Sequence, residues 1–93
     1  MMDTGVIYKH IISSLYKMLC WREEKKHWIT IYDELLSELT FNTYLTDEVK
    51  GNLLLKITKL KYIDFGNFRQ TIFEVINYVE SLRGLQEKSS IQR

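Results

Sequence analysis

The chain has 93 residues, of which 45% are hydrophobic and 27% are charged, so it has material for one modest core and is not wholly disordered. The formal net charge of +1 supplies none of the strong basic excess that marks nucleic-acid-binding domains. Proline is absent and only four glycines occur, which disfavours an all-β domain with many tight turns and makes helix the expected structure.

The cysteine count and the N-terminal residues bear on the compartment. A lone cysteine, Cys20, cannot form an internal disulfide, which is typical of the reducing cytosol. Asp3 stands where an export signal needs positive charge, and Lys9 and His10 interrupt the apolar stretch that follows. No apolar run approaches the roughly 20 residues needed to cross a bilayer. We therefore expect a cytoplasmic protein with no membrane partner, whose mature form is the whole chain.

The first half of the chain has two apolar helical patterns, predicted as helices over 5–22 and 24–39. A charged interval without glycine or proline, residues 22–27, covers the junction of these two predicted helices. One long, bent helix over 5–39 is the alternative, and a break is slightly favoured because a 35-residue helix is rare in a small domain. The two apolar stripes are Ile7, Ile11, Leu15, Met18 and Leu19, then Trp28, Ile31, Tyr32, Leu35 and Leu39.

The middle of the chain contains a predicted loop and a third helix. Residues 40–45 are rich in β-branched and aromatic types, and we expect a structured loop with Phe41 and Tyr44 pointing inward. Thr46 followed by two acids indicates the start of a helix over 47–61. Gly51 within that helix suggests a close helix crossing. The apolar positions of this helix are Val49, Leu53, Ile57 and Leu60.

The last helix, predicted over 65–83, has the widest apolar stripe. Its cap is either Asn67, paired with Gln70 in a capping-box variant, or Asp64 one turn earlier. Gly84 is a predicted stop signal, and residues 86–93 are expected to form a flexible tail. The stripe consists of Phe68, Ile72, Val75, Ile76, Val79 and Leu82. Together these patterns predict an all-α, antiparallel four-helix bundle forming a single domain over 1–85.

Catalytic and metal-binding patterns are missing from the sequence. His10, Cys20 and His27 are isolated and match no zinc spacing. Glu34 and Glu38 lie one turn apart, as paired catalytic carboxylates can, but a solvated acidic face is the commoner reason for such a pair. No nucleophile motif or phosphate-binding glycine loop occurs. We therefore expect no enzyme activity, no catalytic residues, no cofactor and no metal.

Charge is unevenly distributed along the chain. Residues 31–48 contain five acids and no lysine or arginine, whereas residues 50–61 contain four lysines and no acid. The two groups either neutralise each other within the fold or present an acidic surface to a basic partner. The acids are Asp33, Glu34, Glu38, Asp47 and Glu48, and the lysines are Lys50, Lys56, Lys59 and Lys61.

Aromatic residues offer a second indication. Trp21, Trp28 and Tyr32 fall on one side if helix continues through the charged interval, and such aromatic clusters are favoured at protein interfaces. Filling of the core is the commoner role for aromatic residues in a chain this short. Homo-oligomerisation through Trp21 and Trp28 is a further possibility.

These features predict a small non-catalytic, protein-binding module of the inhibitor or immunity type, which neutralises a basic toxin or nuclease. The alternative is a helix-turn-helix-like nucleic-acid-binding or regulatory accessory protein, whose phosphate contacts are Lys56, Lys59, Lys61 and Arg69. The predicted partner-binding residues are Asp33, Glu34, Glu38, Tyr44, Asp47, Glu48 and Trp28.

Overall fold

The computed structural model describes the backbone of residues 4–91 and the side chains of residues 4–84. Within this part of the chain there are four α-helices and no strand, so the predicted all-α, four-helix class is confirmed. A short 3-10 helix, η1, extends the third α-helix. The elements are α1 (Thr4–Glu23), α2 (Ile29–Phe41), α3 (Asp47–Thr58), η1 (Lys59–Tyr62) and α4 (Phe65–Ile91).

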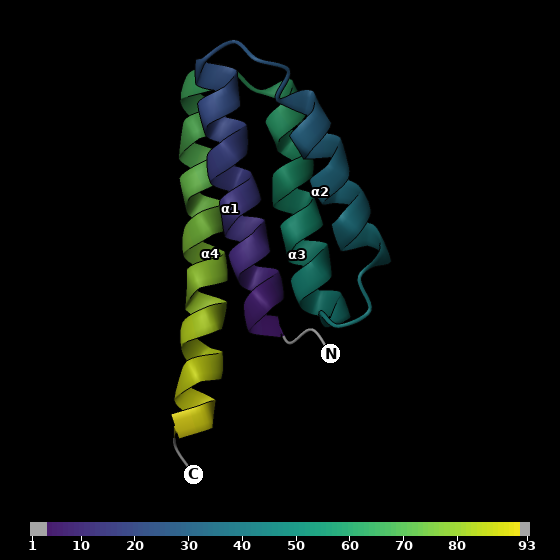
Figure 1. Ribbon diagram of the computed structural model, residues 1–93, viewed down its shortest axis with the longest axis vertical. Coiled ribbons are helices and arrows are strands. Elements are labelled where there is room, and N and C mark those ends of the chain that lie inside the picture. Colours follow the sequence, from purple (N-terminus) through teal and green to yellow (C-terminus); the bar gives the residue numbers. More distant parts are fainter. Residues whose placement is uncertain (1–3, 92–93) are drawn as a thin grey trace.

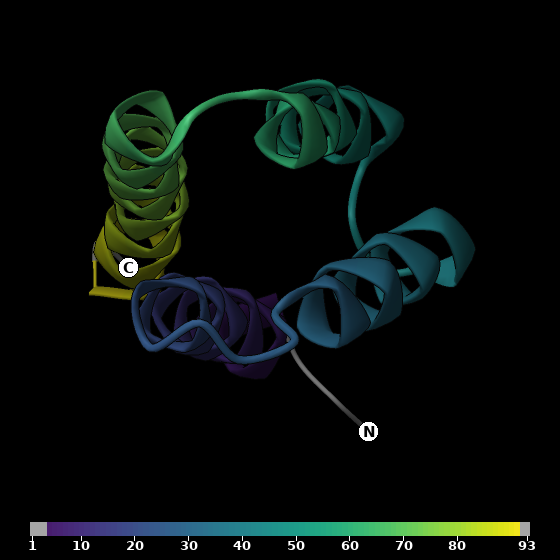
Figure 2. The same ribbon diagram turned by 90° about the horizontal axis from the view of Figure 1, so that it is seen from above.

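The four helices form a closed ring around one core. Figure 1 shows that successive helices run in opposite directions along the long axis of the molecule. Seen from above, the helices stand at the corners of a square, and α1 and α3 each contact both α2 and α4 (Figure 2). We call the end with the α1–α2 and η1–α4 connections the two-loop end, and the end with the α2–α3 connection the one-loop end.

The core contains the apolar stripes that the sequence predicts. Leu15, Leu53, Ile57 and Phe68 have no exposed surface, and every buried described residue is hydrophobic. Full burial of such side chains stabilises a fold by roughly 1.5–3 kcal/mol each. The predicted stripe of α4 is buried from Phe68 to Val79, while Leu82 is partly buried at its edge.

Residues 5–39 form two helices, with the break inside the charged interval. The backbone N–H of Lys26 donates to the Trp21 carbonyl (2.7 Å), and that of Lys25 donates to the Arg22 carbonyl (3.1 Å). Lys25 has a φ of 61°. These are the hydrogen bonds and the left-handed residue of a Schellman motif, which ends a helix. The second helix was predicted to begin at residue 24, which was wrong, because this turn uses residues 24–28.

The α2–α3 connection differs from the prediction in its aromatic residues. Phe41 and Tyr44 were expected to point inward, but their exposed fractions are 79% and 54%. Leu45 is the buried residue of this loop. The Asn42 side-chain oxygen accepts hydrogen bonds from the backbone N–H groups of Tyr44 (2.8 Å) and Leu45 (2.9 Å). This turn packs Leu45 against the core and leaves the rings of Phe41 and Tyr44 exposed to solvent.

The start of α3 is as predicted, but its glycine has a different role. Thr46 accepts a hydrogen bond from the Val49 N–H (3.2 Å), and Asp47 and Glu48 occupy the first turn. Gly51 was expected to mark a close helix crossing. That was wrong, because a Cβ added at Gly51 would meet no atom within 4 Å.

The sequence left two caps open for α4, and the structure selects Asp64. Its side chain accepts the Asn67 N–H (2.9 Å), and its carbonyl accepts the Phe68 N–H (2.8 Å). The predicted stop at Gly84 was wrong, since α4 continues to Ile91. A glycine inside a helix costs about 1 kcal/mol relative to alanine and does not forbid helix.

Beyond Gly84 only the backbone is described, and it is helical as far as Ile91. Residues 92–93 and the side chains after residue 84 lie outside the described residues, so the predicted flexibility of the tail over 86–93 stays a prediction. None of the described helices combines the length and apolar character that crossing a membrane requires.

Candidate functional site

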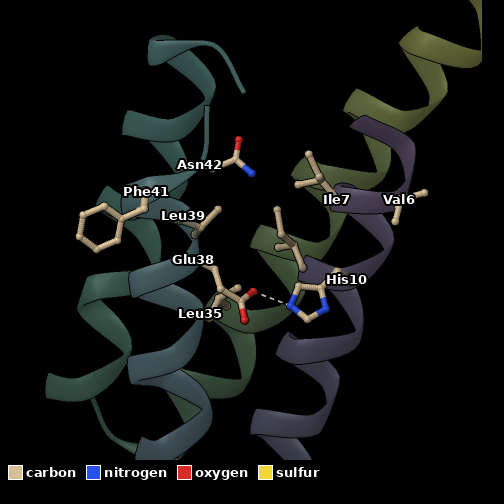
Figure 3. Close-up of a pocket in the computed structure, with 9 residues that line it drawn as sticks. Val6, Ile7, His10, Leu35, Glu38, Leu39, Phe41 and Asn42 are labelled. Atoms are coloured by element: carbon tan, nitrogen blue, oxygen red, sulfur yellow. Dashed lines mark hydrogen bonds and ion pairs between the residues drawn. The ribbon is translucent and has the colours of Figure 1, made fainter. Parts of the chain in front are cut away.

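A cavity of about 480 Å³ opens between α1 and α2 toward the one-loop end. Figure 3 shows the side chains that surround it. The first half of α1 and the second half of α2 provide its walls. The lining residues are Val6, Ile7, His10 and Ile11 from α1, with Leu35, Glu38, Leu39, Phe41 and Asn42 from α2 and its C-terminal cap.

The floor of the cavity is apolar because the core stripes of α1 and α2 meet there. Ile7 and Ile11 on α1 face Leu35 and Leu39 on α2, and all four side chains are buried. These side chains are all aliphatic. The cavity is therefore a hollow over the edge of the core.

One polar pair bridges the two helices across this hollow. The His10 Nε2 and Glu38 Oε2 atoms are 2.5 Å apart, and Figure 3 shows the two side chains meeting between α1 and α2. Their side chains are 56% and 51% exposed. An exposed pair of this kind contributes only about 0–1 kcal/mol. The Glu38 carboxylate is thus within reach of solvent and of a competing cation.

Glu34 and Phe41 lie on the same side of α2 as Glu38. The three positions are spaced at four and three residues, so they recur at about one helical turn. Glu34 is exposed, and the Phe41 ring points away from α1 (Figure 3). We call Glu34, Glu38 and Phe41 the α2 rim. It combines two carboxylates with an exposed aromatic ring beside an apolar hollow.

The structure separates the other predicted site residues into three places. Tyr44, Asp47 and Glu48 lie at the one-loop end, in the α2–α3 connection and the first turn of α3. Asp33 is exposed on α2 but is turned by about 100° from Glu34, because each residue rotates a helix by that angle. Of the predicted site residues, Glu38 lines the cavity, and Glu34 lies about one helical turn away from it on the same side of α2.

Trp28 lies apart from the acidic residues, at the two-loop end. Its ring packs edge-on against Tyr32 (5.8 Å between centroids) and Phe68 (4.9 Å). Trp21 is likewise partly buried against the core, with the Lys17 ammonium 5.3 Å from its ring. Trp28 is therefore part of the packing, and the structure does not bring it together with Tyr44.

Sequence reasoning missed His10, Phe41 and Asn42 as parts of the site. From the sequence, His10 was described only as an isolated histidine that matches no zinc spacing. Its partner Glu38 is 28 residues away, and a sequence gives no measure of that proximity. Phe41 follows the buried Leu39 by two positions, which on a helix places it on the opposite side. That spacing was the available signal for its exposure.

The lysines of the middle segment do not neutralise the acids by direct contact. Within the described residues, no ion pair joins Lys50, Lys56, Lys59 or Lys61 to the five acids of residues 31–48. Lys50 instead places its Nζ 3.5 Å from the Thr40 carbonyl. The acidic side chains of α2 and of the first turn of α3 remain exposed.

Two cations of the nucleic-acid alternative, Lys56 and Arg69, have different surroundings. The Arg69 guanidinium is 5.7 Å from the Phe73 ring, which packs edge-on against Tyr16 of α1, so Arg69 lies on the α1 side of α4. Lys56 is one turn from Asn52, whose side chain donates to the Tyr78 hydroxyl of α4. Moreover, α3 and α4 run side by side (Figures 1 and 2), whereas a helix-turn-helix crosses at about 90–120°.

A second polar cluster fills the two-loop end. The Arg22 guanidinium carbon lies 4.4 Å from the Phe68 ring centroid, 5.2 Å from Trp28 and 5.8 Å from Phe65. Arg22 Nη2 donates to the Ile63 carbonyl (3.2 Å), and Nη1 is buried with no hydrogen-bond partner among the described residues. Aromatic faces hold the cation in place, so this cluster connects α1 to the start of α4.

The titratable groups with altered pKa values are structural. Burial raises the pKa of the Tyr8 hydroxyl, and the neighbouring Tyr78 raises it further. Burial also raises the pKa of Tyr32, with smaller contributions from Tyr62 and Asp33. Both phenols are therefore neutral at physiological pH. No group of three or more His, Cys, Asp or Glu side chains in the described part of the chain could hold a metal ion.

Comparison of the chain with protein-family models, with curated proteins and with solved structures gives no match. The function must therefore be inferred from the site itself.

Proposed function

We propose that this protein is a non-catalytic binding module for a basic partner protein. The partner docks on the α2 rim and on the cavity between α1 and α2, which we call the α1–α2 groove. The observation that carries this proposal is the apolar cavity of about 480 Å³ bordered by the Glu38 carboxylate and the exposed Phe41 ring. Protein interfaces combine an apolar centre with a polar rim, and aromatic residues are enriched among their anchors.

The acidic residues around the one-loop end support a cationic partner. Glu34 and Glu38 are like charges one turn apart on a helix, an arrangement that costs a few tenths of a kcal/mol without a counter-ion. Asp47 and Glu48 add two exposed carboxylates at the same end of the molecule. Such a surface steers a positively charged protein during encounter and speeds its association.

An inhibitor of the immunity type is the biological role that this surface suits best. A small, rigid acidic protein can neutralise a basic toxin or nuclease by covering the cationic surface with which that enzyme holds its own substrate. The resemblance is one of size, helical class and charge, and it serves as an analogy.

The test is a capture experiment from cells of the source organism with three tagged proteins. These are the wild type, a Glu34→Lys/Glu38→Lys variant of the α2 rim, and a Glu23→Lys/Glu24→Lys control with the same charge change at the two-loop end. We expect the wild type and the control to recover the same partner, and the rim variant to lose it in quantitative mass spectrometry.

Thermal melts monitored by circular dichroism establish that all three proteins are folded. Equal recovery of the partner by the wild type and the rim variant would contradict the proposal. Loss of the partner by the control alone would move the binding surface to the two-loop end.

A further inference from the structure

We infer that the α1–α2 groove receives an amphipathic helix of the partner, which inserts an apolar side chain into the cavity and offers an arginine or lysine to Glu38. In the complex this cation replaces His10 as the counter-ion of Glu38. The inference rests on the proposed protein-binding function and names the chemistry of the partner segment.

The size and lining of the cavity fit an apolar side chain. The cavity has about 480 Å³ above a floor of buried aliphatic side chains. Pockets that bury a drug-sized ligand measure about 300–1,000 Å³, so this cavity has room for at least one apolar side chain. Of the nine lining residues, only His10, Glu38 and Asn42 present polar side chains. Those three lie on the walls, so an entering group must be apolar at its tip and polar at its base.

Charge complementarity identifies the second feature of the occupant. The Glu38 carboxylate is 51% exposed, and its described partner is one nitrogen atom of the His10 imidazole. A guanidinium is always charged and can bond both carboxylate oxygens at once. An incoming arginine is therefore a stronger counter-ion for Glu38 than His10 is.

The spacing on α2 favours a helix over an extended strand. Glu34 and Glu38 are four residues apart, about 6 Å along the helix axis, which matches two basic side chains one turn apart on a partner helix. The walls of the groove are both helices, whose backbone groups are already paired. An extended peptide would find no sheet edge here with which to form backbone hydrogen bonds.

His10 acts in this arrangement as an internal competitor. In the free protein its ring holds Glu38 across the mouth of the cavity (Figure 3). Removal of the ring frees the carboxylate, whereas a permanent cation at the same position occupies it more firmly. The inference therefore predicts opposite effects from two substitutions of one residue, which a purely structural role for His10 would not produce.

The test uses a synthetic, fluorescein-labelled helical peptide of 18 residues as its probe, an arbitrary length of about five turns. Leucines at helical spacing form its apolar face, and arginines one turn apart flank that face. Two matched peptides replace either the arginines by glutamates or the leucines by serines. Fluorescence anisotropy at fixed salt gives the dissociation constant of each peptide for the full-length protein and its variants.

We expect His10→Ala to tighten binding of the arginine peptide by about 2–5-fold and His10→Arg to weaken it by a similar factor, as for one exposed ion pair. Val6→Trp at the mouth of the cavity should weaken binding by more than about 5-fold, because its ring competes for the apolar space. Glu34→Lys/Glu38→Lys should weaken it by more than about tenfold. His27→Ala, at the two-loop end, is the control and should change nothing.

Several results would overturn the inference. They include equal binding of the arginine and glutamate peptides, equal binding of the leucine and serine peptides, or the same direction of change for His10→Ala and His10→Arg. Self-association through the groove, seen as a concentration-dependent mass that Val6→Trp abolishes, would assign the occupant to a second copy of this chain.

The failure of this inference can be told from the failure of the proposed function. If capture of the native partner depends on Glu34 and Glu38, while Val6→Trp and His10→Arg leave its affinity unchanged, the binding role stands and the helical occupant is wrong. If charge reversal on the α2 rim does not affect capture, the binding role itself is wrong.

Discussion

The two ends of the bundle close the same four-helix ring with different side chains. At the two-loop end, Trp28, Phe65 and Phe68 surround Arg22 and fill the space between helices. Near the one-loop end, α1 and α2 meet through aliphatic residues and leave a hollow beneath His10 and Glu38. Bulky rings complete one end from within the chain, whereas the other end has apolar surface that a partner can cover.

The charges at the two ends differ in the same way. The cation of Arg22 is held against aromatic faces and partly withdrawn from water, so its contacts are strong and local. The carboxylate of Glu38 is half-exposed and bonded to a single histidine. Stability should therefore be concentrated at the two-loop end, and binding at the one-loop end.

Two phenylalanines give the most direct test of whether stability is concentrated at the two-loop end and binding at the one-loop end. Phe68→Ala should lower the free energy of unfolding by about 3–5 kcal/mol, because Phe68 is fully buried and also supports Trp28 and Arg22. Phe41→Ala removes the same ring from a residue that is 79% exposed and should change stability by less than about 0.5 kcal/mol. Urea unfolding measured by circular dichroism gives both values.

A loss of several kcal/mol from Phe41→Ala would show that the α2 rim supports the fold. It would contradict the assignment of stability and binding to opposite ends of the bundle. If Phe68→Ala leaves too little folded protein to measure, Phe68→Leu gives the same comparison with a smaller expected loss.

Arg22 provides the second test, because it separates the aromatic cage from simple core packing. Arg22→Ala should cost about 1–3 kcal/mol through the loss of three cation–π contacts and the hydrogen bond to the Ile63 carbonyl. Arg22→Lys keeps the charge but loses the flat guanidinium, so it should recover only part of that loss. Equal stability of the lysine variant and the wild type would argue against the stacking.

The apolar stripes could be predicted from the sequence because each depends on spacing within one helix. Phe68, Ile72 and Val75 are buried as their periodicity requires. The end of α1 was less certain, since a lysine takes the left-handed position that glycine usually holds. At Gly84 the error was the opposite one, since a helix end was predicted where the helix continues to Ile91. A single glycine costs a helix only about 1 kcal/mol relative to alanine, so it does not have to end one.

The candidate site was only half predictable for a related reason. Glu34 and Glu38 were identified because their spacing and charge are local features of α2. The cavity and the His10 contact depend on which faces of α1 and α2 meet, and no pattern within either segment contains that information. The packing of Trp28 against the core was likewise decided in part by Phe68, which is 40 residues away in the sequence.

Tyr32 tests the packing between the helices through the pH dependence of stability. Its hydroxyl donates to the Thr58 carbonyl (3.1 Å), so Tyr32→Phe should cost about 0.5–1.5 kcal/mol at neutral pH. Because folding raises its pKa above the ordinary value near 10, the neutral phenol is favoured in the native state. This contribution is complete below about pH 10 and is lost as the pH rises through the folded pKa.

Wild-type stability should accordingly fall above about pH 10, and a Tyr8→Phe/Tyr32→Phe variant should fall less steeply, because Tyr8 is shifted in the same direction. Urea unfolding between pH 8 and 11.5 measures the two slopes, a range chosen to bracket the ordinary tyrosine pKa of about 10. Tyr44→Phe, at an exposed ring, is the matched control for the cost at neutral pH. Identical alkaline slopes for wild type and double variant would contradict the assignment.

The smallest expected effect concerns the turn that closes the two-loop end. Lys25 has a φ of 61°, a conformation that costs an ordinary side chain free energy and costs glycine almost none. Lys25→Gly should therefore raise the free energy of unfolding by about 0.5–1 kcal/mol, despite the added freedom of the unfolded chain.

Lys26→Gly is the matched control, since Lys26 has no positive φ and forms an ion pair with Glu24. It removes the same charge one residue later and should lower stability slightly. A gain from Lys25→Gly without one from Lys26→Gly would show that α1 ends here because the surrounding contacts impose the turn on an unsuitable residue. That result would explain why the sequence only slightly favoured two helices over one long helix across residues 5–39.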